Sequence, residues 1–150
     1  MDLLLWRHAE ALDGEPDHKR PLSARGKRQA KRVARWLREH QPRNLRVFTS
    51  PAVRTTATAA AFSKHHTVLL ELGLGYSAQE ALAAIGWPEL HDPVLLVGHQ
   101  PQLGELAALL LTGKPYPLTI RKGALWWFSR RERDGQTQLF LRTVVTPEML

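Results

Sequence analysis

The chain contains no cysteine. That absence excludes a disulfide framework, a thiolate metal site and any mechanism in which a cysteine attacks the substrate. Long apolar runs are also missing: the longest, at residues 106–111, is far shorter than the roughly 20 residues that a membrane-spanning helix needs. No basic region precedes the short apolar stretch at the N-terminus, so we expect no secretory signal. We therefore expect a soluble, cytoplasmic protein with no membrane partner.

Acidic residues are scarce in one segment of the chain. The whole chain carries 21 lysines and arginines against 14 acids, a formal charge of +7. Between His18 and Arg46 there are 11 basic residues and a single acid, Glu39. Residues 76–150, by contrast, carry equal numbers of basic and acidic side chains. Positive charge concentrated in one region indicates an anionic partner or substrate.

The spacing of apolar residues predicts strands and helices in alternation. With 150 residues the chain can bury one sizeable core, and we expect one domain over residues 1–150. Short apolar runs bounded by turn residues are typical of strands buried on both faces in a parallel sheet. Segments with helical spacing separate these runs, and one opens with the capping box Ser77-Ala78-Gln79-Glu80. The predicted strands are residues 3–6, 45–48, 67–70 and 94–97, and the predicted helices are residues 23–40, 52–62, 77–85 and 103–111.

The end of the chain has a different pattern. Two apolar runs, at residues 124–128 and 138–142, flank a polar segment that contains Asp134-Gly135. This arrangement predicts a β-hairpin. The predicted fold class is therefore α/β: a three-layer α/β/α domain with a mostly parallel central sheet and a C-terminal β-hairpin.

Polar residues follow three of the predicted strands. Arg7 and His8 come after the first strand, Ser50 and Arg54 after the second, and His99 after the strand at 94–97. Ligands of open α/β sheets bind beyond the carboxyl ends of the strands, so we expect two histidines and two arginines at one edge. Two guanidiniums and two imidazoles are typical of a phosphate pocket.

Two helix starts strengthen this expectation. We predict that Ser50 caps the second helix, with Pro51 at its first position, and that Pro101 opens the fourth helix in the same way. Helix N-termini favour a bound anion because their first N–H groups are unpaired. Arg54, about one turn into its helix, is then expected to reach back to that anion.

The three motifs, in this order and spacing, resemble those of the histidine phosphatase superfamily, whose fold is phosphoglycerate-mutase-like. The run Arg7-His8-Ala9 resembles its arginine–histidine signature, Ser50-Pro51-Ala52-Val53-Arg54 its Ser-Pro-x-x-Arg segment, and Gly98-His99 its second-histidine segment. The short chain and the run Lys19-Arg20-Pro21-Leu22-Ser23 resemble the small bacterial SixA-type phosphohistidine phosphatases. One departure is Ala57-Thr58, where members of the family often carry Gln-Thr.

The resemblance implies a catalytic cycle on His8. His8 would take the phosphoryl group and water would then hydrolyse the phosphohistidine. Arg7, Arg54 and His99 would bind and stabilise that group, with Arg20 as a fourth donor. The resemblance implies no metal and no cofactor. Related enzymes that act on phosphate esters supply a carboxylic acid from an insertion, for which this chain has little room; the possible general acid is Glu71, with Glu10 left open.

Three functions remain open at this stage. A phosphorylated imidazole leaves more readily than an alkoxide, so a site without a clear acid favours a protein phosphohistidine phosphatase. The alternatives are a small-molecule phosphomonoesterase with the same pocket and a basic nucleic-acid-binding module. No nucleic-acid motif or aromatic stacking pattern supports the last, so we expect no nucleic-acid partner, and we favour a monomer. Basic residues off the apolar stripe of the first helix form either a solvated face or a docking surface for an acidic phosphoprotein; they are Arg25, Arg28, Lys31, Arg32, Arg35 and Arg38.

Overall fold

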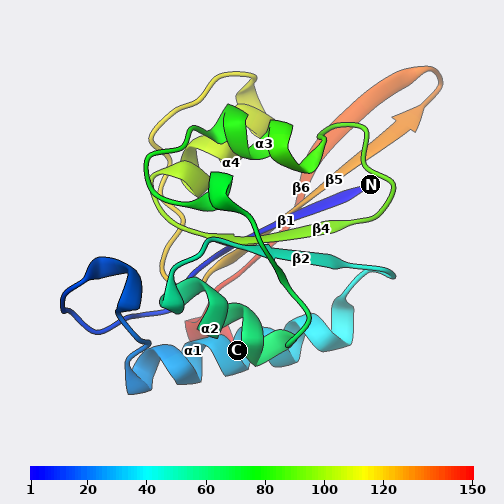
Figure 1. The fold of residues 1–150 in the computed structure, drawn as a ribbon. Coiled ribbons are helices and arrows are strands. Elements are labelled where there is room, and N and C mark those ends of the chain that lie inside the picture. The colour runs from blue at the N-terminus through cyan, green and yellow to red at the C-terminus, as the bar shows by residue number, and fades with distance from the viewer.

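A six-stranded sheet separates two pairs of helices (Figure 1). The computed structural model describes residues 1–150. The strands are β1 (Asp2–Arg7), β2 (Arg46–Thr49), β3 (Thr67–Val68), β4 (Val94–Gly98), β5 (Leu125–Arg133) and β6 (Gln136–Val145), in the order β3-β2-β4-β1-β5-β6. β1 to β4 pair in parallel, whereas β5 runs antiparallel to β1 and β6 antiparallel to β5. The predicted fold class is confirmed.

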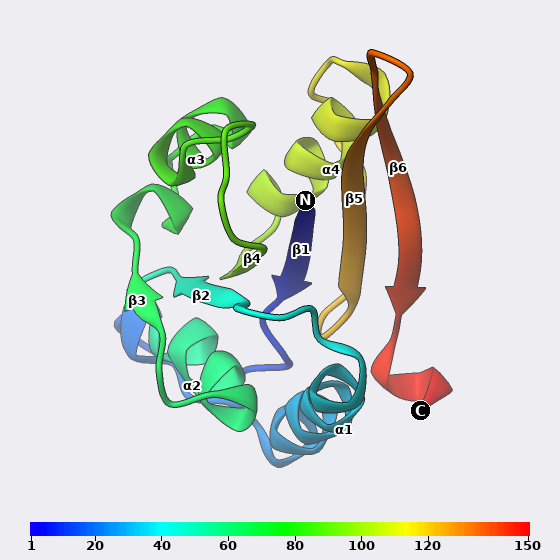
Figure 2. The ribbon, with the colours of Figure 1, turned by 90° about the vertical axis from the view of Figure 1, so that its right-hand side faces the viewer.

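The four helices cover both faces of this sheet. They are α1 (Ala24–His40), α2 (Val53–Phe62), α3 (Ala78–Ile85) and α4 (Gln102–Thr112), with three short 3-10 helices at Asp17–Lys19, Leu70–Leu72 and Pro147–Met149. Figure 2 shows α1 and α2 together on one side of the sheet and α3 and α4 on the other. No helix is long and apolar enough to cross a membrane.

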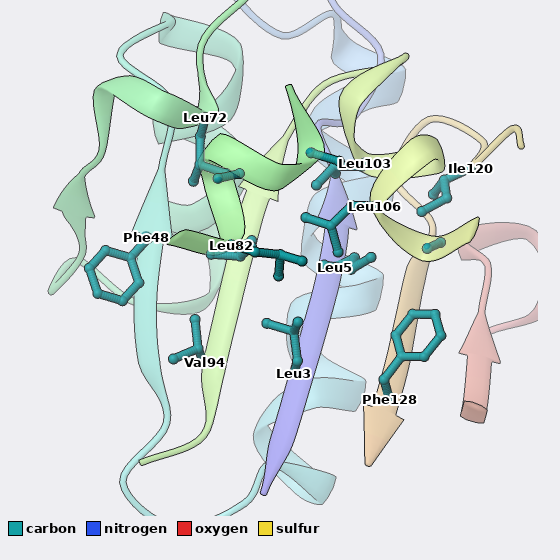
Figure 3. Close-up of a cluster of buried hydrophobic side chains, with 14 of the residues drawn as sticks. Leu3, Leu5, Phe48, Leu72, Leu82, Val94, Leu103, Leu106, Ile120 and Phe128 are labelled. Carbon is teal, nitrogen blue, oxygen red and sulfur yellow. The ribbon is translucent and has the colours of Figure 1, made fainter. Parts of the chain in front are cut away.

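Alternation along β1 distributes its side chains between two cores. Leu3 and Leu5 pack with the residues of α3 and α4, in the cluster drawn in Figure 3. Leu4 and Trp6 pack on the opposite side, against α1 and α2. Because successive side chains of a strand point to opposite faces, a strand between two helical layers must be apolar throughout. The uninterrupted apolar run at the start of the chain therefore predicts this central strand correctly.

Helix boundaries follow their capping residues. Ser77 accepts a hydrogen bond from the N–H of Glu80, and the Glu80 carboxylate accepts one from the N–H of Ser77, so the predicted capping box is confirmed. Gly113 ends α4 with φ 81°, in the left-handed conformation that favours glycine. All four predicted helices are present, and their ends lie close to the predicted ones.

Two local predictions are wrong. The expected buried strand at 67–70 is only the exposed two-residue edge strand β3, and Leu70 starts a 3-10 helix instead. Ser50 does not cap α2, because the N-cap is Ala52 and the helix begins at Val53. The Ser50 hydroxyl instead hydrogen-bonds the ring of His99.

The C-terminal hairpin is confirmed and is longer than predicted. β5 and β6 extend beyond the sheet as a two-stranded arm (Figure 1). Asp134 and Gly135 have φ values of 53° and 74°, as the two central residues of a tight hairpin turn require.

Candidate active site

Three adjacent strands bring the candidate residues into one row. β4 lies between β2 and β1 and is parallel to both, so their carboxyl ends meet at the same edge. The N–H of His8 donates to the carbonyl of Gly98 at 3.0 Å, and the N–H of Ser50 donates to the carbonyl of Val97 at 3.2 Å. The ring centroids of His8 and His99 are 5.3 Å apart. The predicted convergence of the three loops is therefore observed.

The loop that carries His8 is held by three different elements. Its N–H binds β4, as described above, and the N–H of Ala9 donates to Thr58 Oγ1 of α2 at 3.1 Å. The N–H of Glu10 donates to Gln29 Oε1 of α1 at 3.0 Å. Each buried backbone donor needs a partner, and here the three partners fix the position of three consecutive residues. Thr58 is the threonine of Ala57-Thr58, the pair that stands where the resembled family often carries Gln-Thr.

Close approach of α1 adds a steric restraint on the same loop. Gly26 packs so tightly against the backbone of Glu10 that a Cβ atom at this position would overlap the Glu10 carbonyl oxygen. Ser23, which caps α1, also donates its hydroxyl to the Glu10 carboxylate at 3.1 Å. Helix α1 therefore sets the path of the chain just after His8.

The ring of His8 has one free nitrogen. His8 is 7% exposed, and its Nδ1 lies 2.7 Å from the carbonyl oxygen of Ala9. A carbonyl only accepts, so Nδ1 carries the proton and Nε2 keeps its lone pair in the neutral ring. Burial, followed by the positive charges of Arg54 and Arg7, lowers the pKa of His8 to about 4. At neutral pH His8 is therefore uncharged and its Nε2 is available as a nucleophile.

His99 is held from the other side. Its Nε2 lies 2.7 Å from Ser50 Oγ, which is in turn 2.6 Å from Thr55 Oγ1. Its Nδ1 is buried and has no hydrogen-bond partner. Burial is the main reason that the pKa of His99 falls to about 3. A neutral ring with one unpartnered buried nitrogen has room for one further hydrogen bond, to a ligand.

Arg54 is buried and paired with a carboxylate that the motifs did not reveal. Its two terminal nitrogens donate to the carbonyl and the Oδ2 of Asp17, each at 3.0 Å. Asp17 lies in the 3-10 helix of the blue segment beside α2 (Figure 1). Arg20 also donates to Asp17, at 3.1 Å, and to the carbonyl of Leu12. The hydrogen bond from Arg20, with those from Arg54, holds the pKa of Asp17 below its usual range.

Arg7 has no carboxylate partner. One terminal nitrogen donates to the carbonyl of Ile120 at 2.9 Å, and its Nε is buried without a partner. Burial lowers the pKa of Arg7, but a guanidinium starts from so high a value that it stays charged. Arg7 therefore presents an uncompensated positive charge next to His8.

A cavity of about 320 Å³ opens at the His99 end of this row, and we call it the reaction cavity. The predicted residues Arg54 and His99 line it, whereas Arg7 and His8 do not, although the ring of His8 lies 5.3 Å from that of His99. Arg20 and Glu71 do not, although Gly73 and Leu74, just after Glu71, do. Glu10 lines a different cavity, together with Arg7. The residues lining the reaction cavity are Asp17, His18, Ser50, Pro51, Ala52, Arg54, Gly73, Leu74 and His99.

The site is built to receive an oxyanion. The buried guanidinium of Arg54, the half-buried guanidinium of Arg7 and an unpartnered imidazole nitrogen provide donors and positive charge. The neutral ring of His8 lies beside them with a nitrogen that could act as a nucleophile. The structure brings together no group of three or more histidine, cysteine, aspartate or glutamate side chains that could hold a metal ion. Asp17 is the residue that sequence reasoning missed, because it lies in a short 3-10 helix with no apolar periodicity and its role depends on a contact with a residue 37 positions away.

Known proteins that resemble this chain in sequence or fold include several phosphatases. A model of the histidine phosphatase superfamily (branch 1) matches residues 3–82. The chain is 28% identical over 131 residues, 79% of each chain, to the phosphohistidine phosphatase SixA of Escherichia coli. A solved structure from Nakamurella multipartitia, assigned as a phosphohistidine phosphatase SixA, is 31% identical with a TM-score of 0.77 and covers 97% of this chain and 95% of its own. The structure of the protein histidine phosphatase SixA complexed with tungstate is 25% identical, with a TM-score of 0.81 and 99% of both chains covered. The expected phosphoglycerate-mutase-like fold is confirmed.

Proposed function

Because this chain belongs to the histidine phosphatase superfamily, we propose that it is a protein phosphohistidine phosphatase that works through a phosphorylated His8. Membership of the superfamily supports phosphatase activity. The choice of substrate rests on the carboxyl groups near the reacting atoms, because these determine which leaving groups can depart.

His8 is the proposed nucleophile. The lone pair on its Nε2 forms a bond to phosphorus while the bond from phosphorus to the leaving group breaks. Water then attacks phosphorus, releases inorganic phosphate and returns His8 to its neutral form. The hydrogen bond from Nδ1 to the Ala9 carbonyl orients the ring for both steps and stabilises the positive charge that the ring develops.

Arg7, Arg54 and His99 are proposed to stabilise the phosphoryl oxygens. The transferred group spreads its negative charge over three equatorial oxygens, so donors placed around it lower the barrier. When the Ser50 hydroxyl donates to Nε2 of His99, the ring proton of His99 is on Nδ1. This Nδ1–H, which has no partner in the chain, then donates to a phosphoryl oxygen. Arg20 contributes through Asp17, which it helps to hold against Arg54.

The absence of a protonated carboxyl group from the reaction cavity is the observation that carries the substrate proposal. Asp17 is the one carboxyl group that lines this cavity, and its two arginine partners keep it ionised. Glu10 lies in the neighbouring cavity with Arg7, where its carboxylate accepts a hydrogen bond from Ser23. An alkoxide leaves poorly unless an acid protonates it. A phosphorylated imidazole can already carry a proton on its other nitrogen and then departs as neutral imidazole. The site therefore suits phosphohistidine better than a phosphate ester.

Matched peptides test this proposal. Two peptides of one sequence, carrying either phosphohistidine or phosphoserine, are offered to the protein, and kcat/KM is measured by phosphate release. We expect phosphohistidine to be preferred by at least about 100-fold, the usual size of a general-acid contribution. An alkaline quench, in which phosphohistidine survives, should capture labelled phosphate on the wild-type protein and none on His8→Asn.

Two outcomes would overturn the proposal. Comparable kcat/KM values for phosphohistidine, phosphoserine and sugar phosphates would favour the small-molecule phosphomonoesterase. Label on a residue other than His8, or turnover by His8→Asn at the wild-type rate, would remove the nucleophile.

A further inference from the structure

A second cavity meets the active site at Arg7. Its volume is about 310 Å³, and none of its lining residues is hydrophobic. Besides Arg7, its cations are Arg25 of α1 and the pair Arg121 and Lys122, which precede β5. Lys122 is close enough to His8 for its charge to help lower the pKa of that ring. This cavity therefore begins where the proposed chemistry takes place.

The same depression continues along helix α1. A neighbouring cavity of about 210 Å³ shares Arg25, Gln29 and Glu148 with the first and adds Arg28 and Arg32. It too has no hydrophobic lining residue. We call the joined surface the cationic groove and define it by its six basic residues, Arg7, Arg25, Arg28, Arg32, Arg121 and Lys122.

Six basic and two acidic side chains line this groove, so its charge is positive. None of its six basic residues forms an ion pair, whereas Arg20, Arg35 and Arg54 elsewhere each have a carboxylate within 4.0 Å. Two acids line the groove, and Glu10 is engaged by Ser23. Unpaired cations in a concave surface create a field that attracts and orients an anionic ligand.

We propose that the cationic groove binds an acidic segment of the phosphorylated protein, next to the phosphohistidine that enters the site. This inference rests on the proposed function. Arginine forms paired hydrogen bonds with carboxylates, so several arginines in a row match a run of aspartate or glutamate. No aromatic side chain lines the groove, so it has no platform on which nucleic-acid bases would stack. A polypeptide with acidic side chains is the ligand that these groups fit.

Helix α1 provides its own control surface. Lys31 and Arg35 lie on the same helix but line a separate cavity between α1 and α2, whose lining includes four alanines. Arg28 and Arg32 have the same spacing along the helix and are exposed to solvent, as Lys31 and Arg35 are. A double reversal of charge on either pair therefore changes the net charge equally and alters a different surface, although only the control pair also loses an ion pair, Arg35 with Glu39.

The experiment compares Arg28→Glu/Arg32→Glu with Lys31→Glu/Arg35→Glu. Phosphohistidine peptides of one length carry either glutamate or glutamine around the phosphohistidine, and kcat/KM is measured for both. We expect the wild-type protein to prefer the acidic peptide by about tenfold, less so at high salt. We expect the groove variant to lose this preference and the control variant to keep it.

A binding measurement keeps the test independent of catalysis. Fluorescence anisotropy of a labelled acidic peptide that carries plain histidine gives its affinity for all three proteins. A loss of about tenfold in the groove variant alone supports the groove. Three results would each overturn the groove proposal. They are equal affinities of the two variants for the acidic peptide, no preference of the wild-type protein for the acidic peptide, and tighter binding of single-stranded DNA than of an acidic peptide of equal charge. If the wild-type protein hydrolyses no peptide, the proposed function fails, and the anisotropy result alone decides the groove.

Discussion

The reaction cavity, which His99 lines, and the cationic groove, which Arg7 lines, treat charge in opposite ways. In the reaction cavity the polar groups are paired within the chain: Arg54 with Asp17, and His99 with Ser50. In the groove, none of the basic side chains has an acidic partner. Pairing fixes the reacting groups before the substrate arrives. The side chains of the groove have no such partners to fix their positions. The proposed groove could therefore bind acidic sequences whose carboxylates are placed differently.

This difference predicts how strongly each region responds to substitution. Groups that act on the phosphoryl transition state need placement to within a fraction of an ångström, so their loss should reduce the rate by orders of magnitude. Exposed charges interact through water, and each should change binding only a few-fold. The predictions that follow run from the largest expected effect to the smallest.

His8→Ala should reduce kcat by at least about 10,000-fold, because no other group in the cavity replaces the attacking nitrogen. The same substitution should leave the fold intact, since His8 lies in a loop at the sheet edge and its backbone N–H still binds Gly98. Turnover with phosphohistidine peptide and thermal unfolding, measured together, check both statements. Activity at the wild-type level would contradict the first, and an unfolded variant the second.

Arg54→Ala should weaken binding of vanadate, a phosphate analogue, by roughly 100-fold or more, because it removes a buried guanidinium and leaves Asp17 near the anion with Arg20 as its remaining partner. Arg133→Ala, at the exposed end of β5, is the matched control and should change the affinity less than about twofold. Inhibition of turnover by vanadate gives both affinities. An Arg54→Ala affinity like that of the control would exclude Arg54 from anion binding.

Acidification should destabilise the fold through the two buried histidines. In the folded chain the pKa values of His8 and His99 are about 4 and about 3, below the value of 6.5 for a free histidine. Between pH 6.5 and 4 the unfolded chain binds protons that the folded chain does not, so stability falls as the pH falls. His8→Gln should reduce the loss between pH 7 and 4.5 by roughly 2 kcal/mol. Urea unfolding at the two pH values measures it, and an unchanged loss would argue against a neutral His8.

Ser50→Ala should reduce kcat by about tenfold to 100-fold with little change in fold, because His99 loses the hydroxyl that selects its proton position. Nitrogen chemical shifts of the His99 ring, measured by NMR, should then report a mixture of the two neutral tautomers. Ser63→Ala, in the loop after α2, is the control and should alter neither. A kcat loss without any change in the His99 spectrum would assign Ser50 a purely structural role.

Glu148→Gln should have the smallest effect. Glu148 lines both parts of the cationic groove, and its removal makes the groove more positive without touching His8. We expect acidic peptides to bind about twofold to threefold more tightly, with neutral peptides unaffected. Anisotropy at low and high salt checks this. Weaker binding of acidic peptides would mean that Glu148 contacts the ligand favourably, which the groove as described does not allow.

The parts of the site that the sequence predicts are those fixed by local rules. Apolar runs locate β1, β2 and β4, and the parallel arrangement then places Arg7, His8 and His99 at one edge. The edge strand at 67–70 was predicted wrongly because its branched and apolar residues resemble a buried strand, while Val68 is exposed in the fold. Periodicity reports side-chain type, and only the tertiary structure determines how much of a strand is covered.

The parts that could not be predicted depend on contacts between distant residues. Asp17 precedes the basic segment and has no periodic neighbours, so nothing local links it to Arg54. Ser50 precedes a proline, a common capping pattern, yet the helix begins later and its hydroxyl turns to His99. Arg20 and Glu71 were candidates by resemblance or by nearness in sequence, and neither lines the reaction cavity.

The backbone of residues 8–10 has a consequence for motion. Its three amides are bound to a strand, to one helix and to another helix, so releasing the loop requires all three to separate. Such a segment cannot fray by itself. Deuterium should therefore replace its amide protons only at the rate at which the entire chain unfolds. His8 should then keep its position through every smaller fluctuation, and we expect that opening of this loop does not limit turnover.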